Sequence, residues 1–349
     1  MDNIHGVDID AQAVEVTKLS LLLKVLEGES GQLSLGFERA LPDLGANIKC
    51  GNSLIGTDYY ESRMFPEEGE RYRVNAFDWK AEFPAVFIQG GFDAVIGNPP
   101  YIRTLLLEEN KEYFKSAYDS ASGAYDIYVL FLEKALSLSR QNGLIGFITP
   151  NKYFVADYAN KIREILLTHS RLVSIADLGK CKSVFEGALI STAITVYSKD
   201  KPAESIDIKI LSDENVRGIS KVPFITVPLN QLVTTEKIIQ VYADFETNAV
   251  LSKLYQLSDH LSSVAQVRTG VMGFDYWAMD KFIADSNKGR RIATNSYVER
   301  YSFLWGKKVN LYKRNVFEPR LDQSCDILSD NTFELFTSKK IVVRGVARR

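Results

Sequence analysis

Residues 92–101 read Phe-Asp-Ala-Val-Ile-Gly-Asn-Pro-Pro-Tyr, and this stretch decides the fold. It begins as a short apolar run, which is the pattern of a strand buried on both faces of a sheet. Two successive prolines then remove two backbone donors, so the strand must stop near Asn98. Ligands of open α/β sheets bind at the carboxyl ends of the strands. The stretch therefore predicts an amide and an aromatic ring at a ligand-binding edge.

The motif Asn98-Pro99-Pro100-Tyr101 has the chemistry to hold an amino group. The Asn98 side chain and the Pro99 carbonyl can accept two hydrogen bonds from one amine, while Tyr101 offers a ring for stacking. A plain turn with an incidental aromatic residue is the structural alternative. The position of the motif directly after an apolar run favours the binding site.

Length and composition narrow the class of protein. The chain has 349 residues, 46% hydrophobic and 25% charged, which is typical of a soluble protein with two domains. A net charge of −2 confines any contact with nucleic acid to a local patch. Three scattered cysteines and three scattered histidines favour neither disulfides nor a metal site. Without a signal peptide or a membrane-spanning run, we expect a cytoplasmic protein with no membrane partner.

Strands and helices alternate along the first 200 residues, which predicts a doubly wound α/β sheet. We expect the helix that starts at Ala11 to be capped by Asp10, and Asn142-Gly143 to close the helix before the fourth strand. The short link between the last two strands allows an antiparallel edge. Residues 58–85 are expected on the surface, and 102–122 as a polar, mobile segment. The predicted strands are 4–8, 47–54, 92–97, 144–150, 172–178 and 191–197, and the predicted helices are 11–26, 125–139 and 158–169.

The order of several motifs resembles a known family. Gly-Val-Asp8-Ile-Asp, Cys-Gly-Asn52-Ser-Leu and the Asn-Pro-Pro-Tyr stretch follow one another as in gamma-class DNA adenine N6-methyltransferases. The chain is most similar to the large methylases of type IIG restriction–modification systems, which are related to the TaqI methyltransferase. The resemblance is close over residues 1–200. It implies a Rossmann-like class I methyltransferase mixed sheet followed by part of a target-recognition domain.

The resemblance implies a division into three parts and a bound cofactor. Residues 1–200 would be a partial catalytic domain, 201–260 a connector with an edge strand and a helix, and 261–349 the start of the recognition domain. Asp8 would bind the ribose of S-adenosylmethionine, and Ile9 would pack on its adenine. Asn52 would lie near the adenine amino group, where the family commonly has an Asp. By itself, an acid after a strand such as Asp8 is more often a helix cap.

The resemblance also implies the target. Asn98 and the Pro99 carbonyl would hold the N6 amino group of an adenine flipped out of double-stranded DNA. Tyr101 and Phe185 would stack on the two faces of that base. Phe185 taken alone is more often a core residue. Only the motif Val184-Phe185-Glu-Gly-Ala, which continues the family's order of motifs, suggests a role for it.

One part of the family pattern is missing. The glycine-rich loop that would hold the methionine end of the cofactor should precede Asp8, and residues 1–7 contain no such motif. The strand before that loop would lie between the strands at 4–8 and 92–97. We therefore expect an N-terminally truncated enzyme that is inactive alone. A missing N-terminal polypeptide or a restriction subunit would be its partner.

Three functions remain open from the sequence. The first is methylation of adenine N6 in a specific DNA sequence, as part of restriction–modification or a related defence system. The second is a non-enzymatic DNA-binding remnant or subunit that needs a partner. The third is methylation of cytosine N4 or of a protein glutamine. Basic clusters at 288–291, 307–308, 313–314 and 344–349 are expected to contact DNA phosphates, with ordinary solvated charges as the alternative.

Overall fold

The computed structural model divides the chain into two compact units, Met1–Ser258 and Asp259–Arg349. It describes residues 3–28, 43–61, 68–103, 108–181, 190–234, 236–241, 250, 253–254, 257–259, 261–265, 276–285, 287–292, 297–299, 302–311, 314–322, 325 and 327. The predicted domain boundaries at 200 and 260 remain predictions.

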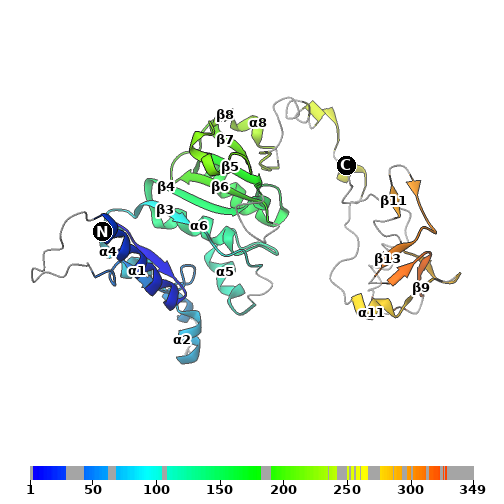
Figure 1. The fold of residues 1–349 in the computed structure, drawn as a ribbon, viewed down its shortest axis with the longest axis horizontal. Helices are drawn as coiled ribbons and strands as arrows, with labels where there is room; N and C mark the ends of the chain where they lie inside the picture. Colours follow the sequence, from blue (N-terminus) through cyan, green and yellow to red (C-terminus); the bar gives the residue numbers. More distant parts are fainter. Residues whose placement is uncertain are drawn as a thin grey trace, which may run out of the picture. The chain divides into compact units, whose positions relative to one another are not determined.

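A six-stranded mixed sheet forms the centre of the first unit (Figure 1). Its parallel pairs are β3–β4 and β5–β7, whereas β6 runs antiparallel to both β4 and β5, and β8 antiparallel to β7. The predicted mixed sheet is therefore confirmed. In spatial order the strands are β3 (Phe92–Gly97), β4 (Ser139–Pro150), β6 (Thr192–Ser198), β5 (Arg171–Lys180), β7 (Ser205–Ser212) and β8 (Ile225–Pro228).

The main hydrophobic core lies between this sheet and its helices. Helix α6 (Tyr128–Leu138) carries mostly apolar residues, and Val129, Leu130 and Leu132 are completely buried. Helix α7 (Asn160–Thr168) adds Ile162 and Leu166 to the same core. Burial of each such side chain contributes roughly 1.5–3 kcal/mol. This core gives the sheet a rigid base for the residues that follow its strands.

A separate two-stranded sheet carries the amino-terminal residues. β1 (Gly6–Asp8) pairs in parallel with β2 (Ile48–Cys50), and α1 (Ala11–Gly28) packs on them. The predicted cap is confirmed, because Asp10 Oδ1 accepts a hydrogen bond of 2.8 Å from the Gln12 N–H. The centroid of the His5 ring lies 5.0 Å from that of the Phe83 ring and 5.6 Å from that of the Phe92 ring. This ring cluster places the small sheet at the β3 side of the large one (Figure 1).

Two predictions about the sheet were wrong. Strand β3 is not buried on both faces: it is one of the two edge strands of the six-stranded sheet among the described residues, and Ile96 is 86% exposed. An apolar run predicts a strand, but only its neighbours decide which faces are covered. The antiparallel strand β6, expected at the edge, lies inside the sheet between β4 and β5.

Local boundaries also differ. Asn142 and Gly143 do not end a helix but lie within β4, where Asn142 adopts a φ of 62° beside a register shift against β3. An asparagine tolerates the left-handed region, so the same pair suits a bulge as well as a helix end.

The segments expected to be surface and mobile supply core residues. Tyr59, Val74 and Phe83 are buried, and Phe114 packs into the main core from α5 (Lys111–Ala117). Charged residues surround these aromatic side chains in the sequence and hide their periodicity. The remaining elements of this unit are η1 (Thr57–Tyr60), α2 (Glu68–Val74), α3 (Trp79–Glu82), α4 (Pro84–Ile88), η3 (Glu108–Asn110), η4 (Asn151–Phe154), η5 (Asp157–Ala159), η6 (Val216–Lys221) and α8 (Leu229–Leu232).

The second unit consists of short strands. Its three-stranded sheet has the order β10-β15-β9, and two hairpins, β11–β12 and β13–β14, accompany it. Most of residues 242–275, where the predicted connector ends and the predicted recognition domain begins, lie outside the described residues. The elements are α10 (Leu261–Val264), α11 (Tyr276–Asp280), β9 (Ile283–Asp285), β10 (Arg290–Arg291), β11 (Val298–Glu299), β12 (Ser302–Phe303), β13 (Val309–Leu311), β14 (Arg314–Val316) and β15 (Pro319–Leu321). Within the described part, no helix is long and apolar enough to cross a membrane.

Candidate active site

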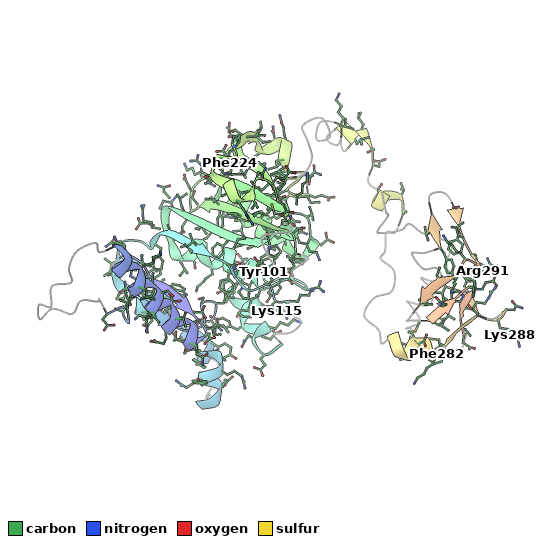
Figure 2. All side chains as sticks on the ribbon, viewed as in Figure 1. Tyr101, Lys115, Phe224, Phe282, Lys288 and Arg291 are labelled. Carbon is green, nitrogen blue, oxygen red and sulfur yellow. The ribbon has the colours of Figure 1, made fainter. Side chains whose placement is uncertain are left out.

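The predicted motif lies at the carboxyl end of β3, as expected from the strand it follows. Asn98 and Pro100 are exposed, Pro99 is buried and Tyr101 is half-buried. The Tyr101 hydroxyl lies 3.1 Å from Asn98 Oδ1 and 3.3 Å from the Ile148 carbonyl oxygen, and it donates to one of them at a time (Figure 2). Burial raises the pKa of Tyr101, so the hydroxyl remains a donor at neutral pH. When it bonds to Asn98, a second lone pair of the amide oxygen is left for a ligand.

A chain of hydrogen-bonded polar groups, of which Tyr128 is buried and Tyr158 and Asp126 are half-buried, adjoins the Tyr101 ring. Tyr128, at the start of α6, contacts this ring edge to face at 6.2 Å between centroids. The Tyr128 hydroxyl lies 2.8 Å from that of Tyr158, which donates to Asp126 Oδ2 at 3.2 Å. Burial raises the pKa of Tyr158 to about 12. With both phenols protonated, the Tyr128 hydroxyl donates to the Tyr158 oxygen, and the Tyr158 hydroxyl donates to the Asp126 carboxylate.

The backbone after the motif is also anchored. The Ile127 N–H donates to the Ile102 carbonyl at 2.9 Å, and Arg103 forms an isolated antiparallel bridge with Asp126. These bonds hold the segment that follows Tyr101 against the start of α6. No sequence pattern assigned a role to Asp126, Tyr128 or Tyr158. An acid and a tyrosine at the start of the apolar stretch that forms α6 were the signal that could have pointed to the first two.

The cofactor-side residues lie at the carboxyl ends of the two short parallel strands. Asp8 ends β1, and one of its carboxylate oxygens accepts a hydrogen bond of 2.8 Å from the Asp10 N–H. Ile9 follows with its side chain 57% exposed. A carboxylate beside an exposed apolar side chain suits a ligand that joins a sugar to an aromatic ring.

Asn52 is held by the loop that follows β2. Its Oδ1 accepts from the Leu54 N–H at 3.1 Å, and its Nδ2 donates to the Val74 carbonyl at 3.2 Å. The Gly51 N–H donates to the Asp8 carbonyl at 2.8 Å, which brings the ends of β1 and β2 together. The amide therefore has a structural task, and one lone pair of its oxygen and one N–H of its nitrogen are left for a ligand.

The residues predicted to bind the cofactor and those predicted to bind the target base all lie at strand ends, but the two groups do not contact each other among the described residues. Within the described residues, no hydrogen bond or ring contact joins Asp8, Ile9 or Asn52 to Asn98 or Tyr101. Phe185, the second predicted stacking residue, lies outside the described residues.

A second polar pair that the sequence did not reveal joins the ends of β4 and β5. Asn151 Nδ2 donates to Asp177 Oδ1 at 3.0 Å, and the Gly179 N–H donates to the other carboxylate oxygen at 3.1 Å. Asp177 is completely buried. Such a buried carboxylate needs these donors, and they tie together two strand ends near the Tyr101 contact at Ile148. The described residues contain no group of side chains suited to hold a metal ion.

Comparison with known proteins identifies a family for this arrangement. The family model named Eco57I restriction-modification methylase matches residues 2–185. The type II restriction enzyme and methyltransferase RM.Eco57I of Escherichia coli is 29% identical over 201 residues, 56% of this chain and 19% of that protein. The adenine-specific methyltransferase PglX of Streptomyces coelicolor is 25% identical over 183 residues, 49% of this chain and 15% of that protein. The chain therefore spans less than a fifth of either relative.

Two solved structures match parts of this chain, both with TM-scores below 0.5. The DrdV–DNA complex has a TM-score of 0.43 at 13% identity and covers 69% of this chain and 25% of that one. The M protein of the type I restriction enzyme EcoKI has a TM-score of 0.40 at 11% identity and covers 72% and 57%. The sequence match spans more than half of the chain and includes the whole Asn98–Tyr101 motif. The chain belongs to the Eco57I restriction–modification methylase family, a family of adenine-specific DNA methyltransferases.

Proposed function

We propose that this chain carries the base-binding half of a cytoplasmic restriction–modification enzyme, which transfers a methyl group from S-adenosylmethionine to N6 of a flipped adenine in DNA. The observation that carries the proposal is the pairing of Asn98 with Tyr101 at the end of β3. This hydrogen bond holds the amide oxygen of Asn98 next to the Tyr101 ring, just after the edge strand β3.

The motif would activate the amine by hydrogen bonding. The exocyclic amine of adenine is a poor nucleophile because its lone pair is delocalised into the ring. Asn98 Oδ1 and the Pro99 carbonyl oxygen would each accept a hydrogen bond from one N–H of this amine. These two bonds would return electron density to the nitrogen. Bound S-adenosylmethionine supplies a methyl group on a sulfonium centre. The residues then act by position and electrostatics, without a covalent enzyme intermediate.

Base stacking would offset the cost of flipping. Taking a base out of the duplex costs a few kcal/mol. Stacking on an aromatic side chain contributes roughly 1–3 kcal/mol per base. Tyr101 would supply one face and Phe185 the other, while Tyr128 and the Tyr158–Asp126 hydrogen bond keep the Tyr101 ring in place.

The ends of β1 and β2 fit the nucleoside part of the cofactor. The Asp8 carboxylate would accept hydrogen bonds from the ribose hydroxyls, the exposed Ile9 side chain would pack on the adenine, and Asn52 would lie near its amino group. Residues 1–7 contain no glycine-rich loop for the methionine part. We propose that a partner polypeptide supplies that contact.

A tritium-transfer assay tests this function. The chain is incubated with labelled S-adenosylmethionine and adenine-containing duplex DNA, with the polypeptide encoded directly upstream added or omitted. We expect label in adenine N6 only when both polypeptides are present. Label in cytosine or in protein would support the third function that the sequence left open. No transfer with either combination would leave a DNA-binding remnant and refute the proposal.

Variants at Tyr101 separate its ring from its hydroxyl. Tyr101→Ala removes both and is expected to abolish transfer. Tyr101→Phe keeps the stacking face and loses only the hydrogen bond to Asn98 or Ile148, so a several-fold loss of rate is expected. Equal rates in the two variants would show that the ring does not stack on the substrate.

A further inference from the structure

Two arginines in the second unit stand directly opposite each other on neighbouring strands. Arg291 on β10 pairs in antiparallel register with Arg320 on β15. Directly opposed residues of an antiparallel pair have Cβ atoms about 4.5–5.5 Å apart on one face of the sheet, and like charges there are destabilising. Among the described residues, neither guanidinium has a salt bridge to a carboxylate. The pair therefore concentrates positive charge that its described surroundings do not neutralise.

Both guanidinium groups lie on the ring of Trp305. The Arg291 Cζ is 5.3 Å and the Arg320 Cζ 5.8 Å from the Trp305 ring centroid. Cation–π contacts of this length hold a guanidinium plane in position while its N–H groups remain able to donate. Arg320 NH1 donates to the Gly289 carbonyl at 3.3 Å, and its buried Nε has no hydrogen-bond partner in the described part of the chain. Arg291 is exposed, and Figure 2 labels its place on the second unit.

The tryptophan is itself part of a fixed aromatic platform. Phe303 stacks on Trp305 at 6.0 Å with an interplanar angle of 21°, and Tyr297 contacts it at 5.4 Å. The Tyr297 ring is completely buried, and its hydroxyl donates to the Phe317 carbonyl at 2.7 Å. Phe303 is nevertheless 46% exposed. A rigid platform lowers the entropy that the two arginines lose when they bind an anion.

We propose that Arg291 and Arg320, supported by Trp305, form a clamp for one phosphate of a DNA backbone. The planar guanidinium group matches a phosphodiester with two N–H donors, and an anion between the two arginines relieves their mutual repulsion. An exposed aromatic ring beside paired cations is the surface composition of a nucleic-acid contact. The choice of DNA as the ligand rests on the proposed function, whereas the clamp geometry does not.

The salt dependence of DNA binding tests the clamp. Each phosphate contact adds about 0.9 to the slope of log K against log salt concentration for duplex DNA. The chain is titrated into a fluorescently labelled duplex of arbitrary sequence at several salt concentrations, and anisotropy is measured. We expect Arg291→Ala and Arg320→Ala each to weaken binding several-fold, and the double variant to lower the slope by about 1. Arg291→Lys keeps the charge and should preserve most of the slope while it weakens binding.

Arg290→Ala is the matched control. Arg290 is the other residue of β10, is also exposed, and pairs with Leu321 in the adjacent register position, so its side chain leaves the opposite face of the sheet. Arg290 belongs to the basic cluster 288–291, but the clamp places the phosphate on the other face of the sheet. The slope in Arg290→Ala should therefore match that of the unchanged chain. An equal loss in Arg290→Ala would show that overall charge, and not a clamp, governs binding.

Other outcomes also decide the matter. An unchanged slope in the double variant, with circular dichroism showing a folded protein, overturns the clamp and leaves the methyl-transfer proposal untouched. Failure of the unchanged chain to bind duplex DNA at low salt overturns it as well. Competition by inorganic phosphate alone, with no DNA binding, would assign the clamp to a free anion instead. A lowered slope with no methyl transfer supports the clamp and refutes only the catalytic role.

Discussion

The two sheets of the first unit differ in how far each supports itself. The six-stranded sheet carries a continuous core, with Leu130 and Ile145 completely buried. The two-stranded sheet has strands of three residues and a buried cluster of only Val14, Leu44 and Ile48 among the described side chains. The outer side of α1 leaves Val16, Leu19 and Leu23 more than half exposed.

This difference separates the two tasks of the proposed site. The base-binding motif follows a strand of the large sheet, so its geometry is held by the main core. The residues proposed to bind the cofactor follow short strands whose own core is small among the described side chains. A two-stranded sheet is marginally stable alone. In the proposed site, the main core therefore holds the base-binding residues more firmly than the cofactor-binding residues.

The largest expected effect is at Asn98. Asn98→Ala removes the acceptor that would activate the target amine, and loss of one such preorganised group lowers kcat about a thousandfold. Tritium transfer in the two-polypeptide assay measures it. DNA affinity should be unchanged, because the exposed amide adds little binding energy. A rate of Asn98→Ala within tenfold of that of the unchanged enzyme would refute the role of Asn98. The large sheet would then no longer be assigned the base-binding task in the comparison of the two sheets.

A matched pair of core substitutions compares the stability of the two sheets. Ile145→Ala in β4 and Ile48→Ala in β2 delete the same atoms from two buried strand positions. We expect Ile145→Ala to lower the free energy of global unfolding by about 4 kcal/mol. Ile48→Ala should change it by less than about 1 kcal/mol, because the small sheet opens locally before the rest unfolds.

Chemical denaturation measures both values, and hydrogen exchange locates the opening. The amides of β1 and β2 should exchange well before those of β5 and β6. Equal losses of stability in the two variants would show that the two sheets unfold as one cooperative unit.

High pH should destabilise the large sheet through Tyr128. Burial, and then the hydrogen bond to Tyr158, raise the pKa of Tyr128 far above its ordinary value of 10.0. The unfolded chain therefore loses this proton above about pH 10 while the folded protein keeps it, so stability is full below that pH and falls above it. The slope contributed by one such tyrosine is about 1.4 kcal/mol per pH unit.

Tyr128→Phe removes that contribution. Urea denaturation at several alkaline pH values should give a shallower fall of the unfolding free energy than in the unchanged chain. Tyr72→Phe, at a tyrosine that is 89% exposed on α2, is the control for the loss of a phenol. Residues 1–52 contain no tyrosine, so the effect belongs to the large sheet and its neighbours. Identical slopes in the two variants would contradict the burial argument.

The smallest effect concerns the cofactor side. Asp8→Asn keeps the shape of the side chain but removes its charge, and we expect about tenfold weaker binding of S-adenosylmethionine by the completed enzyme. Calorimetric titration measures the affinity. Asp10→Asn is the matched control, because asparagine caps a helix as well as aspartate does. Tight binding by the chain alone would show that the small sheet needs no outside support.

The sequence predicted most of the elements of the first unit because their signals are local. Helix α1 begins after Asp10, as the cap predicted, and β4, β5 and β6 cover the three apolar runs assigned to strands. The helix α5 was not predicted in the segment 102–122, because it has a single fully buried residue, Phe114, among charged neighbours. The tyrosine contacts behind Tyr101 escaped detection because Asp126 and Tyr158 are 32 residues apart in the chain.

The sequence by itself determined which side chains stand at Asn98–Tyr101 and the point at which β3 stops, because two prolines end a strand wherever it lies. It also determined the order of motifs that identifies the family. Only the tertiary structure decided that β3 is an edge strand with Ile96 exposed, that the Tyr101 hydroxyl reaches both Asn98 and Ile148, and that Arg291 faces Arg320 across Trp305. Strand pairing and side-chain contacts join residues far apart in the chain, and their register follows from the packing of the whole sheet and from no local pattern.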